Sequence, residues 1–263
     1  MIDHAARRLD WPDLHNARHL DGLPTVDGGR IRSGALVRSD SAQRLTPEGM
    51  AAARAFGIRR VIDLRSQREA RQWPSPFAGD PDYRLRPLID PRREVASPEN
   101  PAHSLAEIYS TSITRNGPFI VAGLAAIADA PPGGVLVHCF VGKDRTGMTV
   151  ALALRLAGVP DEVIAEDYAL SAVCLREEFD TALARARDAT HRRFLVEELS
   201  SRPESILAML DQLDSEYGGI EPYLRAFDMP PEEIDALRDR LVEAGMDPSV
   251  DATDSPGAGT LSR

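Results

Sequence analysis

Residues 134–158, GVLVHCFVGKDRTGMTVALALRLAG, constrain the fold more than any other stretch of the chain. Residues 135–138, VLVH, begin with three apolar residues, two of them β-branched, and follow the chain-breaking sequence Pro-Pro-Gly-Gly, so they predict a buried strand. Residues 146–157 are apolar and end at Gly158, which predicts a buried helix. A strand that passes through one short loop directly into a helix is typical of an α/β protein with a parallel sheet.

The first half of the chain contains further strand and helix signals. Strands are predicted around a turn in residues 30–38, in residues 61–64 and in residues 83–88. Helices are predicted from Pro47 to Gly57, after Ser66, after Ser104 and after Pro118. Ser66 with Glu69 and Ser104 with Glu107 each form a capping box, which marks the start of a helix. Residues 74–101 form a long, proline-rich connection, and such loops are often functional.

The second half reads differently. From Asp161 to about Gly245 the pattern is helical, with interruptions near Cys174, at residues 201–203 and at residues 218–219. We therefore predict an α/β fold in which helices flank a mainly parallel sheet and the C-terminal half is an expanded helical region. We expect a single domain over residues 1–246 and a disordered tail over residues 247–263.

The whole chain limits the classes of function. Its net charge of −10 disfavours nucleic acid as the main partner. The N-terminus lacks the apolar stretch of a secretory signal, and the longest apolar run, residues 119–128, is about half of what a membrane span requires. We expect a cytoplasmic protein by default, with export without a cleaved signal peptide as the alternative. Two cysteines, Cys139 and Cys174, suit a reducing compartment.

Residues 138–147, HCFVGKDRTG, carry the chemistry. A loop that leaves a strand and enters a helix can turn successive N–H groups inward, so residues 140–143 predict an anion cradle at the positive end of the helix dipole. We expect Phe140, Val141, Gly142 and Lys143 to form this phosphate-binding wall. Cys139 opens the loop, where oriented amides favour the thiolate. The planar fork of Arg145 can bind two phosphoryl oxygens.

Each of these residues also has a purely structural interpretation. A lone cysteine is usually a small buried hydrophobic residue. His138 fixes the start of the loop by hydrogen bonding or is simply a satisfied core residue. Thr146 donates its hydroxyl to the sulfur, or caps the helix, or does both. The combination of these residues between a strand and a helix favours the functional interpretation.

The loop resembles the signature loop of the cysteine-dependent protein tyrosine phosphatases. Its second half, Gly-Lys-Asp-Arg-Thr-Gly, resembles the bacterial group typified by the mycobacterial protein tyrosine phosphatase B. Residues 16–18, 34–41, 61–66 and 218–227 also look like that group, so the similarity covers roughly residues 12–245. The resemblance implies a phosphatase without metal or other cofactor, in which Cys139 attacks phosphorus, a phosphocysteine forms and water releases phosphate. Arg145 and the loop amides would stabilise the equatorial oxygens.

The leaving oxygen needs a proton, and four aspartates are candidates for the general acid. Asp144 is favoured because the resemblance places the proposed acid at this position of the loop. Asp63 ends a predicted strand and, in a parallel sheet, would emerge beside Cys139, where it either orients Arg145, serves as the acid or forms a salt bridge with Arg65 or Arg68. Asp90 and Asp129 are expected to be a turn residue and a helix-end residue.

The only lysine among the 31 lysines and arginines lies in this loop. The resemblance to lipid phosphatases implies that Lys143 is a compact, mobile charge beside the pocket. We therefore expect hydrolysis of phosphotyrosine and phosphoinositides, with weaker activity on phosphoserine and phosphothreonine. The partners would be phosphorylated proteins or phosphoinositide head groups. The alternatives are a catalytically silent phosphate-binding or scaffold module and a sulfurtransferase.

A helical lid is a further expectation. Residues 161–213 contain more helix than a minimal phosphatase needs, and their apolar residues would form a lid over the loop or pack as core. These residues are Val173, Leu175, Phe179, Phe194 and Leu195.

Overall fold

The computed structural model describes residues 5–92 and 104–243, so the predicted tail over residues 247–263 lies outside it. In the described part the main sheet has the order β1 (Arg18–His19), β3 (Leu36–Ser39), β6 (Gly134–His138), β4 (Ile58–Asp63) and β5 (Tyr83–Leu85). β1 pairs with β3 in the antiparallel sense, and all other neighbours are parallel. The predicted α/β fold with a mainly parallel sheet is confirmed.

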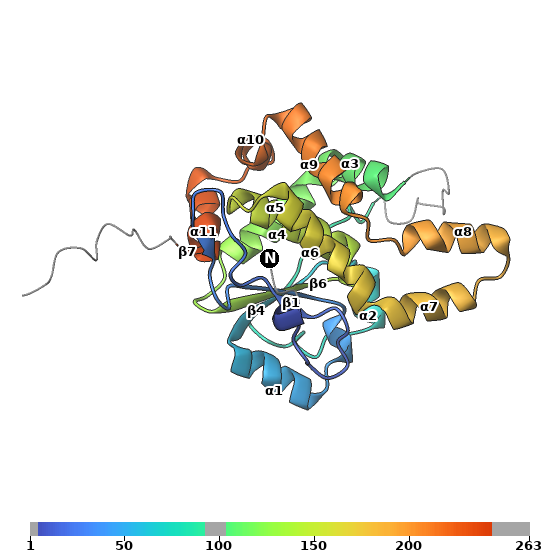
Figure 1. Cartoon of the computed structure of the whole chain (residues 1–263). Helices are drawn as coiled ribbons and strands as arrows, with labels where there is room; N and C mark the ends of the chain where they lie inside the picture. Colours follow the sequence, from blue (N-terminus) through green and yellow to red (C-terminus); the bar gives the residue numbers. More distant parts are fainter. Residues whose placement is uncertain (1–4, 93–103, 244–263) are drawn as a thin grey trace, which may run out of the picture.

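Helices cover both faces of this sheet. α1 (Pro47–Phe56) lies on one face, and α4 (Gly117–Ala128), α5 (Asp144–Leu156) and α6 (Asp161–Cys174) lie on the other (Figure 1). The strand residues alternate accordingly: Val61 packs in the cluster on the α1 side, and its neighbour Ile62 packs in the cluster on the α5 side. Strands buried on both faces read as continuous apolar runs, which is why the sequence revealed them.

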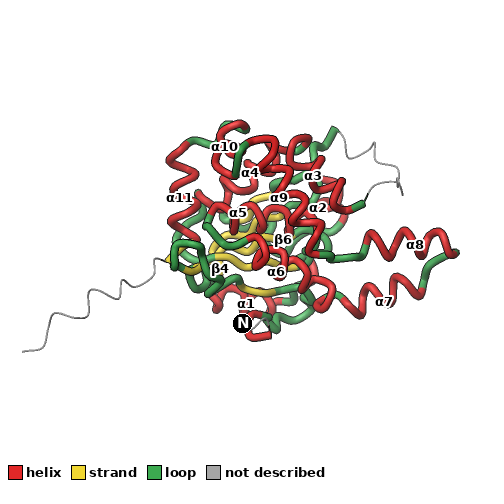
Figure 2. Tube along the Cα trace, turned by 45° about the horizontal axis from the view of Figure 1, so that its top comes forward, coloured by secondary structure: helices red, strands yellow, loops and turns green. Residues whose placement is uncertain are grey.

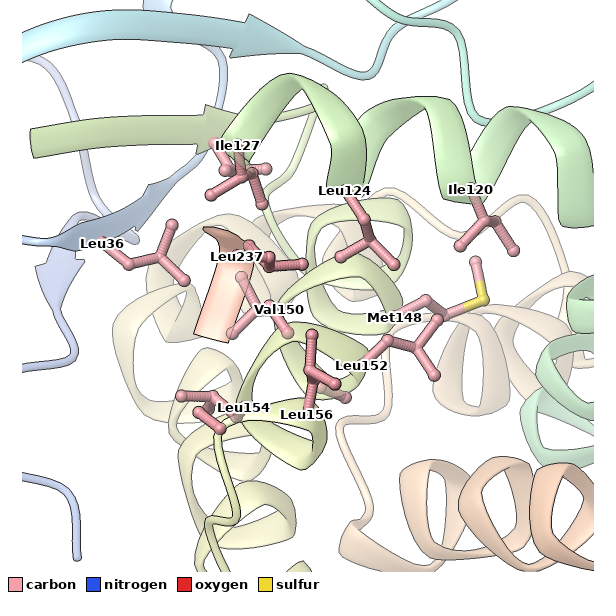
Figure 3. Close-up of a cluster of buried hydrophobic side chains, with 14 of the residues drawn as sticks. Leu36, Ile120, Leu124, Ile127, Met148, Val150, Leu152, Leu154, Leu156 and Leu237 are labelled. Atoms are coloured by element: carbon pink, nitrogen blue, oxygen red, sulfur yellow. The ribbon is translucent and has the colours of Figure 1, made fainter. Parts of the chain in front are cut away.

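The larger core lies between the sheet and the helices of the second half. Figure 3 shows side chains of α4 and α5 gathered with Leu36 of β3 and Leu237 of α11 (Pro231–Leu241). Leu152, in the middle of α5, is completely buried in this cluster. The core therefore fixes α5 against the sheet along its length, and with it the loop that precedes α5.

The remaining helices include four in the expanded helical region of the second half. These remaining helices are α2 (Gln67–Gln72), α3 (Leu105–Arg115), α7 (Arg176–Ala184), α8 (Ala189–Glu198), α9 (Pro203–Tyr217) and α10 (Ile220–Ala226). The predicted interruptions near Cys174, at residues 201–203 and at residues 218–219 all separate helices. α7 and α8 form an antiparallel arm that projects from the body (Figures 1 and 2). No residue of α7 or α8 is buried.

One prediction for the second half is wrong. The chain does not stay helical to Gly245, because β7 (Val242–Glu243) pairs with β2 (Arg30–Ile31) in a second, two-stranded sheet. The side chain of Arg32 donates to the carbonyl oxygens of Asp239 and Val242, which ends α11 next to the open edge of β2. β2 and β7 are far apart in the sequence, so the local helical pattern did not reveal their pairing.

The register of the sheet brings three strand ends to one edge. His138 at the end of β6 pairs with Ser39 of β3 on one side and with Asp63 of β4 on the other. The chain then leaves β6 between the ends of two neighbouring strands. In open α/β sheets this crevice at the carboxyl ends is where ligands bind.

Substitution of Leu152 tests the role of this core. We expect Leu152→Ala to lower the free energy of unfolding by about 2–5 kcal/mol, because it leaves a cavity among side chains that cannot collapse fully. Val26→Ala is the control, since Val26 is 79% exposed, and we expect a change of no more than about 0.5 kcal/mol. Denaturant unfolding of both variants measures the difference, and equal losses would contradict this description of the core.

Candidate active site

The loop from Cys139 to Lys143 joins the end of β6 to the start of α5. Gly142 allows it to turn against the end of β3. The φ angle of Gly142 is 72°, in the left-handed region, and a Cβ at this position would lie 2.3 Å from the backbone oxygen of Ser39. Only glycine satisfies both the dihedral angle and the space.

Every carbonyl oxygen from residue 139 to residue 142 accepts a hydrogen bond from outside the loop. The donors are His138 Nδ1 to Cys139 (3.1 Å), Ser41 N to Phe140 (3.1 Å), Asn16 Nδ2 to Val141 (3.2 Å), and Asn16 Nδ2 and Arg38 Nη2 to Gly142 (3.1 and 2.8 Å). A trans peptide group points its N–H away from its C=O. The N–H groups of residues 140–143 are therefore turned to the opposite side, into the curve of the loop.

These inward N–H groups have few partners within the protein. The N–H of Gly142 donates to the Sγ atom of Cys139 over 3.2 Å. Within residues 5–92 and 104–243, the N–H groups of Phe140, Val141 and Lys143 have no acceptor. Protein N–H groups away from bulk water are rarely left unpaired, and a row of them at a helix N-terminus is a ready anion site. The loop thus has the geometry of a cradle that suits an oxyanion, with the sulfur of Cys139 at its base.

An ion cluster of one aspartate and three buried arginines lies behind the loop and positions two of its hydrogen-bond donors. The Asp167 carboxylate of α6 pairs with Arg7, Arg18 and Arg38 at 2.9, 3.1 and 2.8 Å. Burial raises the pKa of Asp167, but the charges of the arginines outweigh it and hold the pKa well below its usual range. Arg18 also donates to the side-chain oxygen of Asn16 over 2.6 Å, and the Asn16 amide nitrogen faces the loop. Asp167 therefore fixes Asn16 and Arg38, the two side chains that donate to the carbonyl oxygens of Val141 and Gly142.

Arg145, in the first turn of α5, is held by Glu69 of α2. Its two Nη atoms contact the two carboxylate oxygens at 2.5 and 2.9 Å. Burial raises the pKa of Glu69, but the hydrogen bond and the charge of Arg145 outweigh this effect, so the pKa lies below its usual value. The same carboxylate accepts the N–H of Ser66 over 2.8 Å in the capping box of α2. The sequence predicted the cap but not this contact with Arg145.

The sequence of the chain as a whole matches a family of known proteins. A family model described as "Tyrosine phosphatase family" matches residues 9–243. The chain belongs to this family.

Three relatives extend the comparison. The chain is 33% identical over 242 residues to a tyrosine-protein phosphatase of Nostoc commune, covering 84% of this chain and 79% of that protein. It is 30% identical over 280 residues to the triple specificity protein phosphatase PtpB of Mycobacterium tuberculosis, covering 90% and 99%. It is 28% identical over 229 residues to a putative tyrosine-protein phosphatase of Cupriavidus necator, covering 82% of each chain.

In this tyrosine phosphatase Lys143 is not the mobile charge that the sequence suggested. Its side chain is only 2% exposed. Its Nζ atom donates to the carbonyl oxygens of Glu198, at the end of α8, and of Ser200, the latter over 2.9 Å, and lies 3.2 Å from Asp144 Oδ1. The end of α8 covers the lysine, and this long-range contact could not be read from the local motif.

Asp144 is placed by two tyrosines as well as by Lys143. The Tyr109 hydroxyl donates to Oδ1 of Asp144, and the Tyr168 hydroxyl lies 2.8 Å from that of Tyr109. Burial raises the pKa of Tyr109 well above its usual value, so this hydroxyl keeps its proton and remains a donor. In the described part of the chain Oδ2 of Asp144 has no hydrogen-bond partner, and the side chain is 32% exposed. Neither tyrosine was identified from the sequence, because both lie on other helices.

Asp63 has the buried environment of a structural residue. Its carboxylate contacts Arg65 Nη2 at 2.6 Å and the Tyr83 hydroxyl at 2.8 Å. Burial raises the pKa of Asp63, but His138 and Arg65 outweigh it and bring the pKa to about 2. Burial also lowers the pKa of His138, so the imidazole is neutral at neutral pH and Arg65 supplies the pairing charge. The salt bridge with Arg65, one of the three predicted roles, is therefore present, whereas Arg145 is oriented by Glu69.

Three further candidates from the sequence are Thr146, in the first turn of α5, and Asp90 and Asp129, which lie away from the loop. The Thr146 hydroxyl is buried, and the described residues offer it no partner, so its contact with sulfur or substrate stays a prediction. Asp90 pairs with Arg92, and Asp129 pairs with Arg60, which leaves both aspartates in structural roles. Within the described ranges no group of three or more histidine, cysteine, aspartate or glutamate residues is arranged to hold a metal ion.

Of the five apolar residues predicted to form a lid or pack as core, only Leu175 is buried. Val173 is 55% exposed, and Leu175 is buried but outside both core clusters. Phe179, Phe194 and Leu195 are half-buried on the projecting arm. Core packing is therefore wrong for Val173, which is exposed on α6, and for the three residues on the arm, whereas Leu175 at the end of α6 is buried. Closure of the arm over the loop stays a prediction.

Gly142→Ala tests the loop geometry. We expect it to weaken binding of orthovanadate at least 100-fold, because the added Cβ meets the backbone of Ser39 and disturbs the inward N–H groups, a loss of roughly 3 kcal/mol. Gly28→Ala is the matched control: its φ is 85°, but a Cβ there meets nothing within 4 Å, so it carries only the backbone strain of about 1–2 kcal/mol. Vanadate titration and thermal unfolding separate the two effects. Unchanged vanadate affinity in Gly142→Ala would contradict the cradle.

Proposed function

We propose that this protein hydrolyses phosphate monoesters through a phosphocysteine. Sγ of Cys139 attacks phosphorus and displaces the alcohol or phenol oxygen, and water then attacks phosphorus and releases phosphate and the thiolate. The observation that carries this proposal is the row of N–H groups turned inward above Sγ, which suits the equatorial oxygens of a phosphoryl group in both steps. No metal or other cofactor takes part in either step.

Arg145 supplies the charge for the transferred group. Glu69 occupies the Nη ends of the guanidinium, and within the described residues Nε has no partner. The edge formed by Nε and Nη2 is the one that can bind two phosphoryl oxygens side by side. The ion pair thus orients the fork without blocking that edge.

Asp144 is the proposed general acid. Its Oδ1 atom is held by Tyr109 and Lys143, while the unpartnered Oδ2 can carry the proton to the leaving oxygen. In the second step the same carboxylate accepts a proton from water. Asp63 is a poor candidate, because a group whose pKa is about 2 is ionised across the physiological pH range and has no proton to give.

Phosphotyrosine is the first proposed substrate class, and phosphoinositides are the second, with weaker activity on phosphoserine and phosphothreonine. Membership of the tyrosine phosphatase family supports the first. The name of the mycobacterial relative, which describes that protein as having triple specificity, supports a broad range. A role for Lys143 on a second phosphate requires that its ammonium leave the carbonyl oxygens of Glu198 and Ser200.

We also propose that residues 1–246 form one phosphatase domain. The family match over residues 9–243 supports this, because it includes both the sheet and the helical second half. In the described part of the chain no helix is long and apolar enough to span a bilayer.

Asp144→Asn tests the acid assignment. For a substrate with a poor leaving group, such as phenyl phosphate or phosphoserine, we expect kcat to fall about 10²–10⁴-fold, because the proposed proton donor is gone. For p-nitrophenyl phosphate, whose leaving group departs readily as an anion, the loss should be much smaller. Steady-state rates across pH, with chelator present, measure both effects.

The controls for this experiment are Cys139→Ser and Asp63→Asn. Cys139→Ser should show no turnover while still binding phosphate, and full activity in this variant would end the proposal. Asp63→Asn should retain the leaving-group independence of the wild type and lose mainly stability. A larger leaving-group effect in Asp63→Asn than in Asp144→Asn would reverse the assignment. Phosphate binding by the wild type without turnover on any substrate would favour the silent binding module.

Lys143→Ala tests the substrate range. If Lys143 contacts a second phosphate, the variant should lose kcat/KM for phosphoinositides by about 10-fold more than for phosphotyrosine peptides, since one charge-assisted hydrogen bond contributes about 1.5–3 kcal/mol. Parallel assays of the two substrate classes measure the ratio. Equal losses on both would remove the phosphoinositide part of the proposal.

A further inference from the structure

The tip of the α7–α8 arm carries a local concentration of positive charge that the catalytic site does not use, although the whole arm, residues 176–198, has five arginines and six acidic residues. The tip, residues 185–193 with the sequence RARDATHRR, contains four arginines and one aspartate. The chain as a whole has a net charge of −10. Figures 1 and 2 show from two directions that this tip is the part of the arm farthest from the body.

The four tip arginines face one carboxylate at the tip, that of Asp188, which interacts electrostatically with Arg187. They are Arg185, Arg187, Arg192 and Arg193, and all four are exposed. None of them forms an ion pair with a carboxylate anywhere in residues 5–92 and 104–243. Arg192 instead donates to the carbonyl oxygen of Leu183, and Arg193 lies near the Thr190 hydroxyl. By contrast, Arg225 and Arg238 on α10 and α11 both pair with Glu221.

Apolar side chains follow the basic tip directly. Phe194, Leu195 and Val196 are consecutive on α8, and the first two are only half-buried while Val196 is 46% exposed. None of the three belongs to either core cluster of the protein. Exposed arginines next to an exposed valine and two half-buried apolar side chains on a helix suit a segment that lies on a membrane surface.

We propose that the tip of the α7–α8 arm docks on an anionic lipid surface. The arginines would be attracted by acidic head groups, and the apolar residues of α8 would enter the boundary between head groups and acyl chains. This proposal does not depend on the chemistry of Cys139. An acidic protein could match the charge, but it would not need the exposed Val196 beside the arginines.

The base of the arm is joined to the catalytic loop. The carbonyl oxygens of Glu198 and Ser200, at the end of α8, hold the ammonium of Lys143. α8 has ten residues, so its length is about 15 Å from the tip to this contact. A lipid surface bound at the tip would therefore lie close to the loop, on the side where α8 meets Lys143.

Vesicle sedimentation with the full chain tests this proposal. At about 0.1 M salt we expect the wild type to bind vesicles of phosphatidylcholine with phosphatidylserine and not vesicles of phosphatidylcholine alone, with weaker binding at higher salt. The double variant Arg192→Gln/Arg193→Gln should lower the partition coefficient about 30-fold, from roughly fivefold for each arginine. Val196→Ser should weaken binding further, because Val196 would enter the interface.

The matched control is Arg59→Gln/Arg225→Gln, which removes the same charge from exposed positions outside the arm. It should bind vesicles as the wild type does. Turnover of p-nitrophenyl phosphate and the circular dichroism spectrum should be unchanged in all variants, which separates failure of docking from failure of the fold or of the phosphatase activity. Equal binding to both kinds of vesicle, equal loss in the control, or retention on an acidic polypeptide without vesicle binding would overturn the proposal.

Discussion

The bonds that pull the loop carbonyl oxygens outward are the interactions on which the site depends. Arg38 and Asn16 make the decisive ones, and Asp167 in α6 holds Arg38 directly and Asn16 through Arg18. An inward N–H row would otherwise be unstable, because the peptide groups of a free loop can rotate toward water. Burying an ion cluster is costly in itself, and it contributes little to net stability. Its value here is conformational, since through Asn16 and Arg38 it fixes the peptide planes that carry the carbonyl groups of Val141 and Gly142.

A second ion pair prepares the arginine. The pair between Arg145 and Glu69 uses the same glutamate that closes the capping box of α2, and α2 begins directly after β4. The direction of the Arg145 guanidinium is therefore set by Glu69, whose side chain is itself fixed in the capping box at the end of a sheet strand. Holding the charged groups in place before the substrate arrives avoids the cost of reorganising them during the reaction. The cradle and the fork are thus oriented by two different helices, α6 and α2.

The sequence predicted what is local and missed what is distant. The strand, loop and helix around Cys139 follow from periodicity and glycine positions, and the parallel sheet follows from alternating strands and helices. Glu69 was recognised only as a helix cap, because capping boxes are local, whereas its contact with Arg145 spans 76 positions. Tyr109, Asp167 and the end of α8 meet the loop only after the chain has folded. The misplaced expectation for Lys143 has the same origin.

The position of Lys143 bears on substrate choice. Its ammonium already has two carbonyl acceptors, and a hydrogen bond to a charged group contributes about 1.5–3 kcal/mol. A substrate with one phosphate can occupy the cradle without disturbing these contacts. A substrate with a second phosphate must offer the lysine more than the end of α8 does, so it also competes with the base of the arm. If Lys143 binds a second phosphate, as we propose, the arm and that phosphate would be alternative partners of one ammonium group, and displacement of α8 would favour the more highly phosphorylated substrate.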